Sequence, residues 1–156
     1  MPAAISERVV ETRDAAATRA LAARLARVAR AGDVVALVGP LGAGKTQFAK
    51  GFGSGLGVAA TINSPSFVLM AEYAGRLPLF HLDLYRVAGG ADALAGGLLD
   101  ERQVEGVSLI EWAERLEDAL PAGRLEVAID GTGEAARRIT LRACAADYAR
   151  YVEAAG

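Results

Sequence analysis

Cysteine and histidine are scarce in this chain, which contains 1 of each in 156 residues. Because Cys144 has no second cysteine to pair with, no internal disulfide can form, and a zinc site built from cysteines alone is excluded. The single histidine, His81, likewise excludes metal sites built on several imidazoles. A metal site, if there is one, must therefore be built mainly from other residue types.

Long apolar runs and a strong net charge are also missing. No run reaches the roughly 20 residues that span a bilayer, and the start MPAAISERVVET lacks the charged segment and apolar core of a signal peptide. The formal net charge of -2 argues against a protein that coats nucleic acid by bulk electrostatics. We therefore expect a cytoplasmic protein with no membrane contact.

What is present is the composition of a folded protein, with 53% hydrophobic and 23% charged residues. The length fits one core, and no repeat, linker or low-complexity segment divides the chain. We expect a single domain over 1–156, whose tail at 144–156 either forms a terminal helix or frays.

Short β-branched or alternating stretches predict the strands. Two of them, 33–38 and 107–112, are almost wholly apolar, as strands buried on both faces are. Two hairpins are expected as well, one turning at 74–76 and one joining 124–130 to 137–143 through GTGEAA. A first strand at 5–11 completes the set.

Helical periodicity predicts an amphipathic helix over 14–33, with Asp14 as its N-cap and Gly32 as its stop. A second helix is expected over 45–57, although the glycines in its second half each cost about 1 kcal/mol relative to alanine. A third helix at 112–120 stops before a proline. Together these elements predict a three-layer α/β domain whose mixed sheet is partly antiparallel.

Residues 39–46, GPLGAGKT, match the Walker A pattern G-x-x-x-x-G-K-[ST] between an expected strand and an expected helix. Gly42 and Gly44 allow positive φ, so that successive backbone N–H groups form one anion cradle at a helix N-terminus. Lys45 supplies a compact charge for the β- and γ-phosphates, and Thr46 offers a hydroxyl to Mg²⁺. The pattern predicts nucleotide binding by a P-loop. The expected contacts there are Leu41, Gly42, Ala43, Gly44, Lys45, Thr46 and Gln47.

The scarcity of lysine supports this interpretation. The chain uses arginine almost everywhere, and its only lysines are Lys45 and Lys50. A point charge suits the phosphate loop better than the wide guanidinium fork, so lysine at this position favours a phosphate-binding role over chance.

A P-loop site also needs a carboxylate at the end of a neighbouring strand. Glu111 closes the apolar run VSLIE, the pattern of an acid at a carboxyl strand end, although it could instead cap the helix that follows. Asp83 in LFHLDLYR also follows an apolar run, but pattern alone equally allows a surface partner for Arg86.

The segment NSPSF places Ser64 and Ser66 between the P-loop helix and the next strand. That is the position of a switch segment that senses the γ-phosphate, but an ordinary Ser-Pro turn fits the residues as well. His81 and Trp112 are more typical of a hydrogen-bonded core histidine and a packing side chain than of a base and a stacking platform. No N-K-x-D element supports guanine specificity.

GPLGAGKTQF, SPSF, HLDLYR and LIEWAERL, in this order, resemble the bacterial P-loop ATPase family TsaE (formerly YjeE) over roughly residues 5–140. The resemblance implies that Thr46 and Glu111 contact Mg²⁺ and that Asp83 is a second acid needed for ATP hydrolysis. It also places Ser64 and Ser66 in a switch loop that contacts the nucleotide. Lys45, Asp83 and Glu111 are thus the expected catalytic residues.

The resemblance also implies a function and partners. The protein would be a weak, Mg²⁺-dependent ATPase of tRNA threonylcarbamoyladenosine modification, and it would reset the TsaB–TsaD complex between turnovers. Stimulation by these partners would follow if their contact completes the site. Pro40 and Gln47 depart from the family pattern, as does Ser66, which keeps a hydroxyl but loses the methyl group of the usual threonine.

Two other functions remain open at this point. A small-molecule P-loop kinase would need arginines on a lid, for which Arg86 and Arg102 are the only obvious candidates. A nucleotide-dependent binding module that does not hydrolyse ATP is the second.

Some contacts stay undetermined in the sequence. The adenine could lie near Asp14 or near Arg137 and Arg138. Direct tRNA contact also stays open, because the arginines between 24 and 30 are most simply a solvated helix face.

Overall fold

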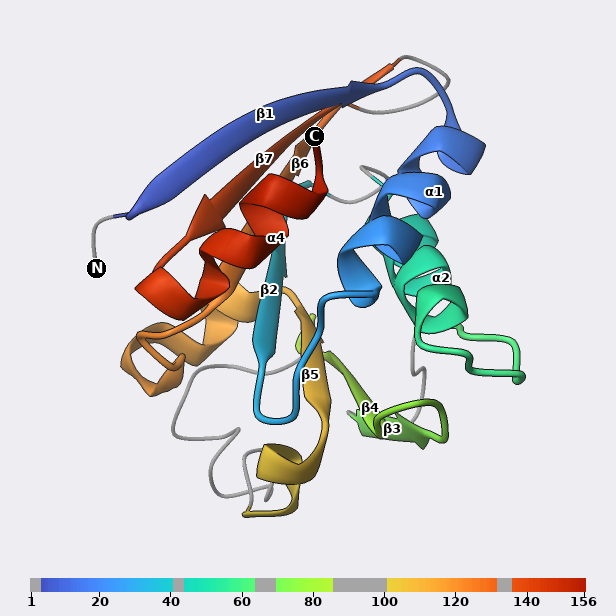
Figure 1. Ribbon diagram of the computed structural model, residues 1–156, viewed down its shortest axis with the longest axis vertical. Coiled ribbons are helices and arrows are strands. Elements are labelled where there is room, and N and C mark those ends of the chain that lie inside the picture. The colour runs from blue at the N-terminus through green and yellow to red at the C-terminus, as the bar shows by residue number, and fades with distance from the viewer. Residues whose placement is uncertain (1–3, 41–43, 64–69, 86–100, 132–135) are drawn as a thin grey trace.

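The computed structural model describes residues 4–40, 44–63, 70–85, 101–131 and 136–156. Its centre is a seven-stranded mixed sheet in the order β1-β7-β6-β2-β5-β4-β3 (Figure 1). The strands are β1 (Ser6–Thr12), β2 (Val34–Val38), β3 (Met70–Tyr73), β4 (Leu79–Asp83), β5 (Val107–Glu111), β6 (Leu125–Asp130) and β7 (Arg137–Ala143). The helices are α1 (Ala15–Ala26), α2 (Lys45–Gly55) and α4 (Ala149–Ala154), with 3₁₀ helices η1 (Glu101–Glu105), η2 (Ala113–Ala119) and η3 (Ala146–Tyr148).

Parallel pairing holds the middle of the sheet together, where β6, β2, β5 and β4 lie side by side. Antiparallel partners flank this group: β7 and β1 at one side and β3 at the other. Both predicted hairpins are therefore confirmed, as is the prediction of an α/β fold with a partly antiparallel sheet.

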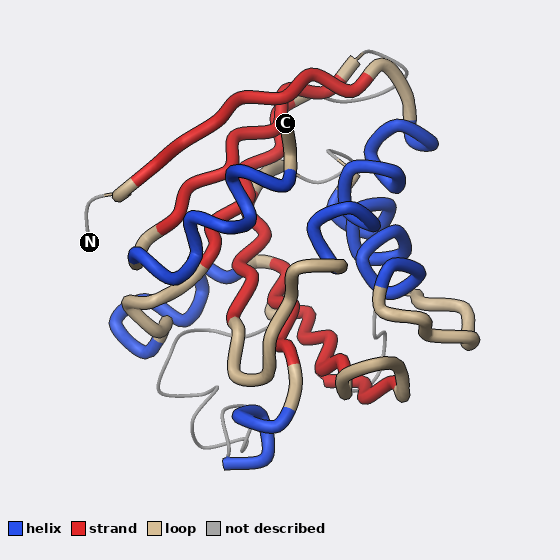
Figure 2. The backbone as a smooth tube through the Cα atoms, viewed as in Figure 1, coloured by secondary structure: helices blue, strands red, loops and turns tan. Residues whose placement is uncertain are grey.

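Alternation along the strands separates two apolar clusters. Val35 and Leu37 of β2 pack in the large core with α1, α2 and α4, whereas Ala36 between them packs on the other side of the sheet, beside residues of η2. Figure 2 shows α4 in front of β6 and β7, with α1 and α2 side by side to its right, as labelled in Figure 1. Because β4 and β5 alternate in the same way, every second side chain of these strands faces the layer that contains α2.

Helix α1 is shorter than predicted, since it ends at Ala26 and not near Gly32. Its start is as expected, because the Asp14 carboxylate accepts a hydrogen bond from the Ala17 N–H at 2.8 Å. At the other end, the guanidinium of Arg76, between β3 and β4, donates to the carbonyls of Ala26 and Ala29. These carbonyls are satisfied from outside the helix, which the local sequence does not show.

The glycines of α2 serve close packing against α1. A Cβ added at Gly51 would lie 2.2 Å from the Arg19 carbonyl oxygen, and one at Gly55 would lie 2.4 Å from that of Ala23. The two helices therefore touch through backbone, and this contact compensates for the poor helix propensity of glycine. Arg19 also donates to the Gln47 side chain at 2.7 Å.

The tail forms the short helix α4 and packs onto the start of β2. The Asp33 carboxylate accepts hydrogen bonds from the Tyr151 hydroxyl at 2.6 Å and from the Arg150 guanidinium, and the Tyr148 hydroxyl accepts one from the Val34 N–H. Burial and the adjacent Asp33 raise the pKa of Tyr151. Among the residues that the structure describes, no helix is both long and apolar enough to cross a lipid bilayer.

Candidate functional site

The P-loop runs from the end of β2 to the start of α2, as predicted. Gly39 and Gly44 have φ of 147° and 107°, values that side-chain-bearing residues rarely adopt, and Gly44 is the N-cap of α2. The positive end of the α2 dipole and the N–H groups of its first turn thus point toward the loop. The predicted contacts Leu41, Gly42 and Ala43 lie outside the described residues.

Lys45, the first residue of α2, is only 5% exposed and is bonded to its own loop. Its Nζ donates to the carbonyl oxygens of Gly39 at 2.5 Å and Pro40 at 3.3 Å. Burial lowers the pKa of Lys45, while the nearby carboxylates, Glu111 first among them, oppose that shift. The ammonium therefore rests at the mouth of the loop, beside acceptors that a phosphate oxygen could replace.

Trp112 covers the Lys45 ammonium. The Lys45 Nζ atom lies 3.8 Å from the centroid of the Trp112 ring. The centroid of the Tyr85 ring lies 5.1 Å from that of Trp112. Trp112 reaches this place because its φ is 58°, the only positive value among the described non-glycine residues. Such a conformation costs of order 1–3 kcal/mol in a bulky residue and is concentrated at functional sites. Trp112 packs against the smaller apolar cluster, as the sequence indicates, and in addition contacts the lysine.

Asp83 and Glu111 come together at the carboxyl ends of adjacent strands. They are direct partners in the parallel register of β4 and β5, and Glu111 is also paired with Leu37 of β2, just before the P-loop. Residues opposite each other in a parallel pair point to the same face, here the face of α2. The expectation that both acids lie beside the loop is met in the fold; their catalytic roles stay predictions.

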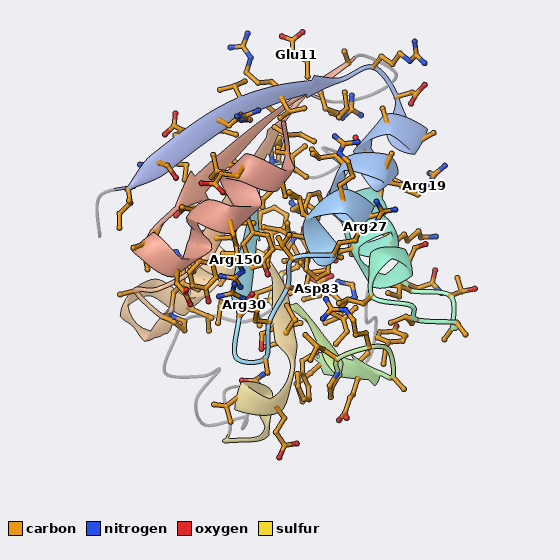
Figure 3. All side chains as sticks on the ribbon, viewed as in Figure 1. Glu11, Arg19, Arg27, Arg30, Asp83 and Arg150 are labelled. Atoms are coloured by element: carbon orange, nitrogen blue, oxygen red, sulfur yellow. The ribbon has the colours of Figure 1, made fainter. Side chains whose placement is uncertain are left out.

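Burial distinguishes the two carboxylates. Glu111 is only 3% exposed, whereas Asp83 is partly exposed and accepts a hydrogen bond from the Tyr85 N–H at 3.1 Å. Burial is the main cause that raises the pKa of Asp83, and the charge of Glu111 acts in the same direction. The proposed alternative partner of Asp83, Arg86, lies outside the described residues. In the view of Figure 3, Asp83 is labelled near the middle of the molecule and Glu11 at its upper edge.

His81 is fully buried on β4, two residues before Asp83 and on the same face. Its Nε2 lies 2.6 Å from Oε2 of Glu111. The prediction of a hydrogen-bonded core histidine is therefore confirmed. The sequence did not reveal that its partner is the candidate acid at the end of the next strand, because that contact depends on strand pairing.

Of the other predicted nucleotide contacts, two lie within the described residues and two do not. Thr46 lies half-buried in the first turn of α2, and the Gln47 side chain accepts a hydrogen bond from Arg19. Ser64 and Ser66 lie outside the described residues.

The adenine candidates are also separated by the fold. Asp14 caps α1. Arg137 lies beside the P-loop, with its Nε 3.9 Å from where a Cβ of Gly44 would stand. Arg138 points to the opposite face of β7 and lies 3.7 Å from the Glu11 carboxylate. A hollow of about 350 Å³ at this end of the sheet is lined by Glu11, Asp130, Gly131, Ala136, Arg137 and Arg138.

The oxygen donors at the loop fit a hydrated Mg²⁺ better than a metal caged by protein. Two carboxylates, Asp83 and Glu111, meet at the strand ends, and the Thr46 hydroxyl lies in the adjacent first turn of α2. No group of three or more His, Cys, Asp or Glu side chains suited to a metal occurs within the described ranges. Mg²⁺ typically uses one or two carboxylates and keeps its other positions for water and phosphate, so this donor set suits it.

The raised pKa of Asp83 predicts a pH-dependent cost to stability. Above its folded pKa the carboxylate is charged in a site that disfavours the charge, and this cost disappears as the pH falls below the ordinary pKa of about 3.9. Asp83→Asn keeps the acceptor for the Tyr85 N–H. In nucleotide-free protein it should raise the free energy of unfolding by up to about 1 kcal/mol near neutral pH, with a clearly smaller gain at about pH 4.

Urea unfolding at the two pH values tests this expectation. The matched control is Asp130→Asn, an exposed aspartate on β6, which should change the unfolding free energy by less than about 0.5 kcal/mol. A loss of stability in Asp83→Asn at neutral pH, or a gain that is the same at both pH values, would contradict the assignment.

Comparisons with known proteins agree with this fold and show the family of the chain. The family model described as "Threonylcarbamoyl adenosine biosynthesis protein TsaE" matches residues 12–139. The tRNA threonylcarbamoyladenosine biosynthesis protein TsaE of Bacillus subtilis is 44% identical over 132 residues, which cover 84% of this chain and 82% of that protein. The protein of the same name from Streptomyces coelicolor is 39% identical over 130 residues, covering 79% and 88%. The crystal structure of Bacillus subtilis YdiB matches with a TM-score of 0.76 and 38% identity, over 96% of this chain and 94% of that one. The chain belongs to the TsaE family.

Proposed function

We propose that this protein acts in tRNA threonylcarbamoyladenosine biosynthesis as a Mg²⁺-dependent ATPase. The family supports the pathway. The observation that carries the ATPase assignment is the meeting of Lys45 with Asp83 and Glu111 at one edge of the sheet. A P-loop lysine beside two strand-end acids is the arrangement used for phosphoryl transfer to water.

In this proposal different residues contact the phosphates, hold Mg²⁺ and support hydrolysis. The backbone of 41–44, Lys45 and the first turn of α2 with Thr46 and Gln47 would hold the phosphates, with Ser64 and Ser66 close to the γ-phosphate. Thr46 and Glu111 would hold Mg²⁺, which supplies charge neutralisation at the β- and γ-phosphates. Asp83 would support hydrolysis as the second acid. Lys45 must leave the carbonyls of its own loop to contact phosphate.

The partners proposed for the protein are TsaB and TsaD. Hydrolysis of ATP by this chain would reset their complex between turnovers, without transfer of the threonylcarbamoyl group by this chain itself. Pro40 cannot donate an N–H to phosphate. A partner that supplies further donors would complete such a site and stimulate hydrolysis, as groups supplied in trans do in other P-loop proteins.

The first test is ATP hydrolysis with and without a TsaB–TsaD pair. Stimulation is expected for the wild type and for Lys50→Ala, and its loss by about a hundredfold or more in Lys45→Ala and Glu111→Gln, because charge stabilisation of the transition state is removed. Lys45 and Lys50 are the chain's only lysines, so Lys50→Ala is a matched control. Stimulation that is indifferent to Lys45, or fast phosphorylation of a metabolite as in a kinase, would overturn the proposal.

We also propose that the nucleoside part of ATP lies on the Arg137 side of the late hairpin. Arg137 faces the P-loop and Arg138 faces the outer side of β7, so the two substitutions form a natural pair. Arg137→Ala should weaken ATP binding by about tenfold, the loss expected for one charged contact, whereas Arg138→Ala should leave it within about twofold.

Equilibrium binding of a fluorescent ATP analogue to the two variants measures this difference. Equal weakening by both substitutions would point to a general charge effect and contradict a local contact. Full binding by Arg137→Ala would place the nucleoside elsewhere.

A further inference from the structure

His81 is the feature of the site that the proposed function leaves without a role. It is the chain's single histidine, it is fully buried, and it lies between Leu79 and Asp83 on the face of β4 that meets α2. In the parallel register its own partner is Leu109, two residues before Glu111. The histidine thus lies beneath the acid, one step further into the core.

The contact between the two side chains is short. Nε2 of His81 lies 2.6 Å from Oε2 of Glu111, within hydrogen-bond distance. Both side chains are almost entirely removed from solvent, with 0% and 4% exposure. In such a place each hydrogen bond to the carboxylate influences where its oxygens point.

The second ring nitrogen determines which form of histidine fits. Nδ1 of His81 is buried and has no hydrogen-bond partner within the described part of the chain. A proton on Nδ1 would therefore lack an acceptor, which is costly in a buried site. The tautomer with its proton on Nε2 fits these surroundings, because Nε2 then donates to Glu111 and Nδ1 carries no hydrogen that needs an acceptor.

We propose that His81 is a positioning residue, whose Nε2–H holds Oε2 of Glu111 and so keeps the carboxylate directed at the P-loop. The inference rests on the proposed ATPase function and adds a residue to it. Without this donor, the Lys45 ammonium is a competing partner on the same side of the sheet, since Glu111 is its leading charge neighbour. Hydrogen bonds behind metal-binding carboxylates typically change metal affinity or activity by 10–100-fold.

Three substitutions separate positioning from simple filling of the core. In His81→Gln the new amide nitrogen can reach the place of Nε2, whereas in His81→Asn the amide reaches only the place of Nδ1. His81→Met fills a similar volume but donates nothing. Partner-stimulated ATP hydrolysis is measured for each variant, together with its free energy of unfolding.

The expected result is a pattern and not a uniform loss. His81→Met and His81→Asn should lower kcat by about tenfold or more with little change in the KM for ATP, and His81→Gln should recover most of the rate. If activity follows unfolding free energy in all three variants, or if His81→Gln is no better than His81→Met, His81 only fills the core and the inference is overturned.

A second measurement does not depend on hydrolysis. Because the chain has 1 histidine, ¹⁵N NMR of the imidazole is unambiguous, and it should show a proton on Nε2, the nitrogen that faces Glu111. A proton on Nδ1 alone would overturn the inference, because Nε2 would then have no hydrogen to donate. A wild type that hydrolyses no ATP with TsaB–TsaD would instead overturn the proposed function, while the NMR result would still test the His81–Glu111 contact.

Discussion

The parallel pairing of β2, β5 and β4 is the constraint on which the candidate site depends. It brings the end of β2, which leads into the P-loop, next to Glu111 and then Asp83. Side-chain direction alternates along a strand, so a slip of one residue in β5 would turn Glu111 away from α2 and bring Ile110 to its place. The apolar residues of the same strands oppose such a slip, because it would expose their core-facing side chains to the wrong layer. Core packing and site geometry are therefore specified by one register.

The charged side chains of the site lower the stability of the ligand-free protein, because Lys45 and Asp83 are partly removed from water. Lys45 is buried and held by loop carbonyls and by the ring of Trp112, which itself needs a positive φ. Asp83 is half-buried close to a second carboxylate, so its charged form is disfavoured. A Mg²⁺–nucleotide would bring positive charge to the acids and negative charge to the lysine, and thus relieve both. Strain and unfavourable burial collected at one place are typical of functional sites.

Local patterns in the sequence were enough to predict most strands and helices, both hairpins, and an acid such as Glu111 at a strand end. The helix expected at 112–120 is instead the 3₁₀ helix η2. What they could not predict depends on contacts between distant segments. The Arg76 guanidinium binds a carbonyl at the end of α1, and Gly51 is explained by the approach of α1. The positive φ of Trp112 cannot be predicted from the sequence, because tryptophan rarely adopts it. The link from His81 to the site appears only when β4 and β5 are paired.

The central claim is that the P-loop lysine and the strand-end acids form one Mg²⁺–nucleotide site covered by Trp112, the chain's only tryptophan. Its fluorescence therefore reports directly on the position of Lys45. We expect a saturable change in emission when Mg²⁺ and a non-hydrolysable ATP analogue are added to the wild type, and no such change in Lys45→Met. Unchanged emission at saturating nucleotide, or the same response in both proteins, would contradict the account.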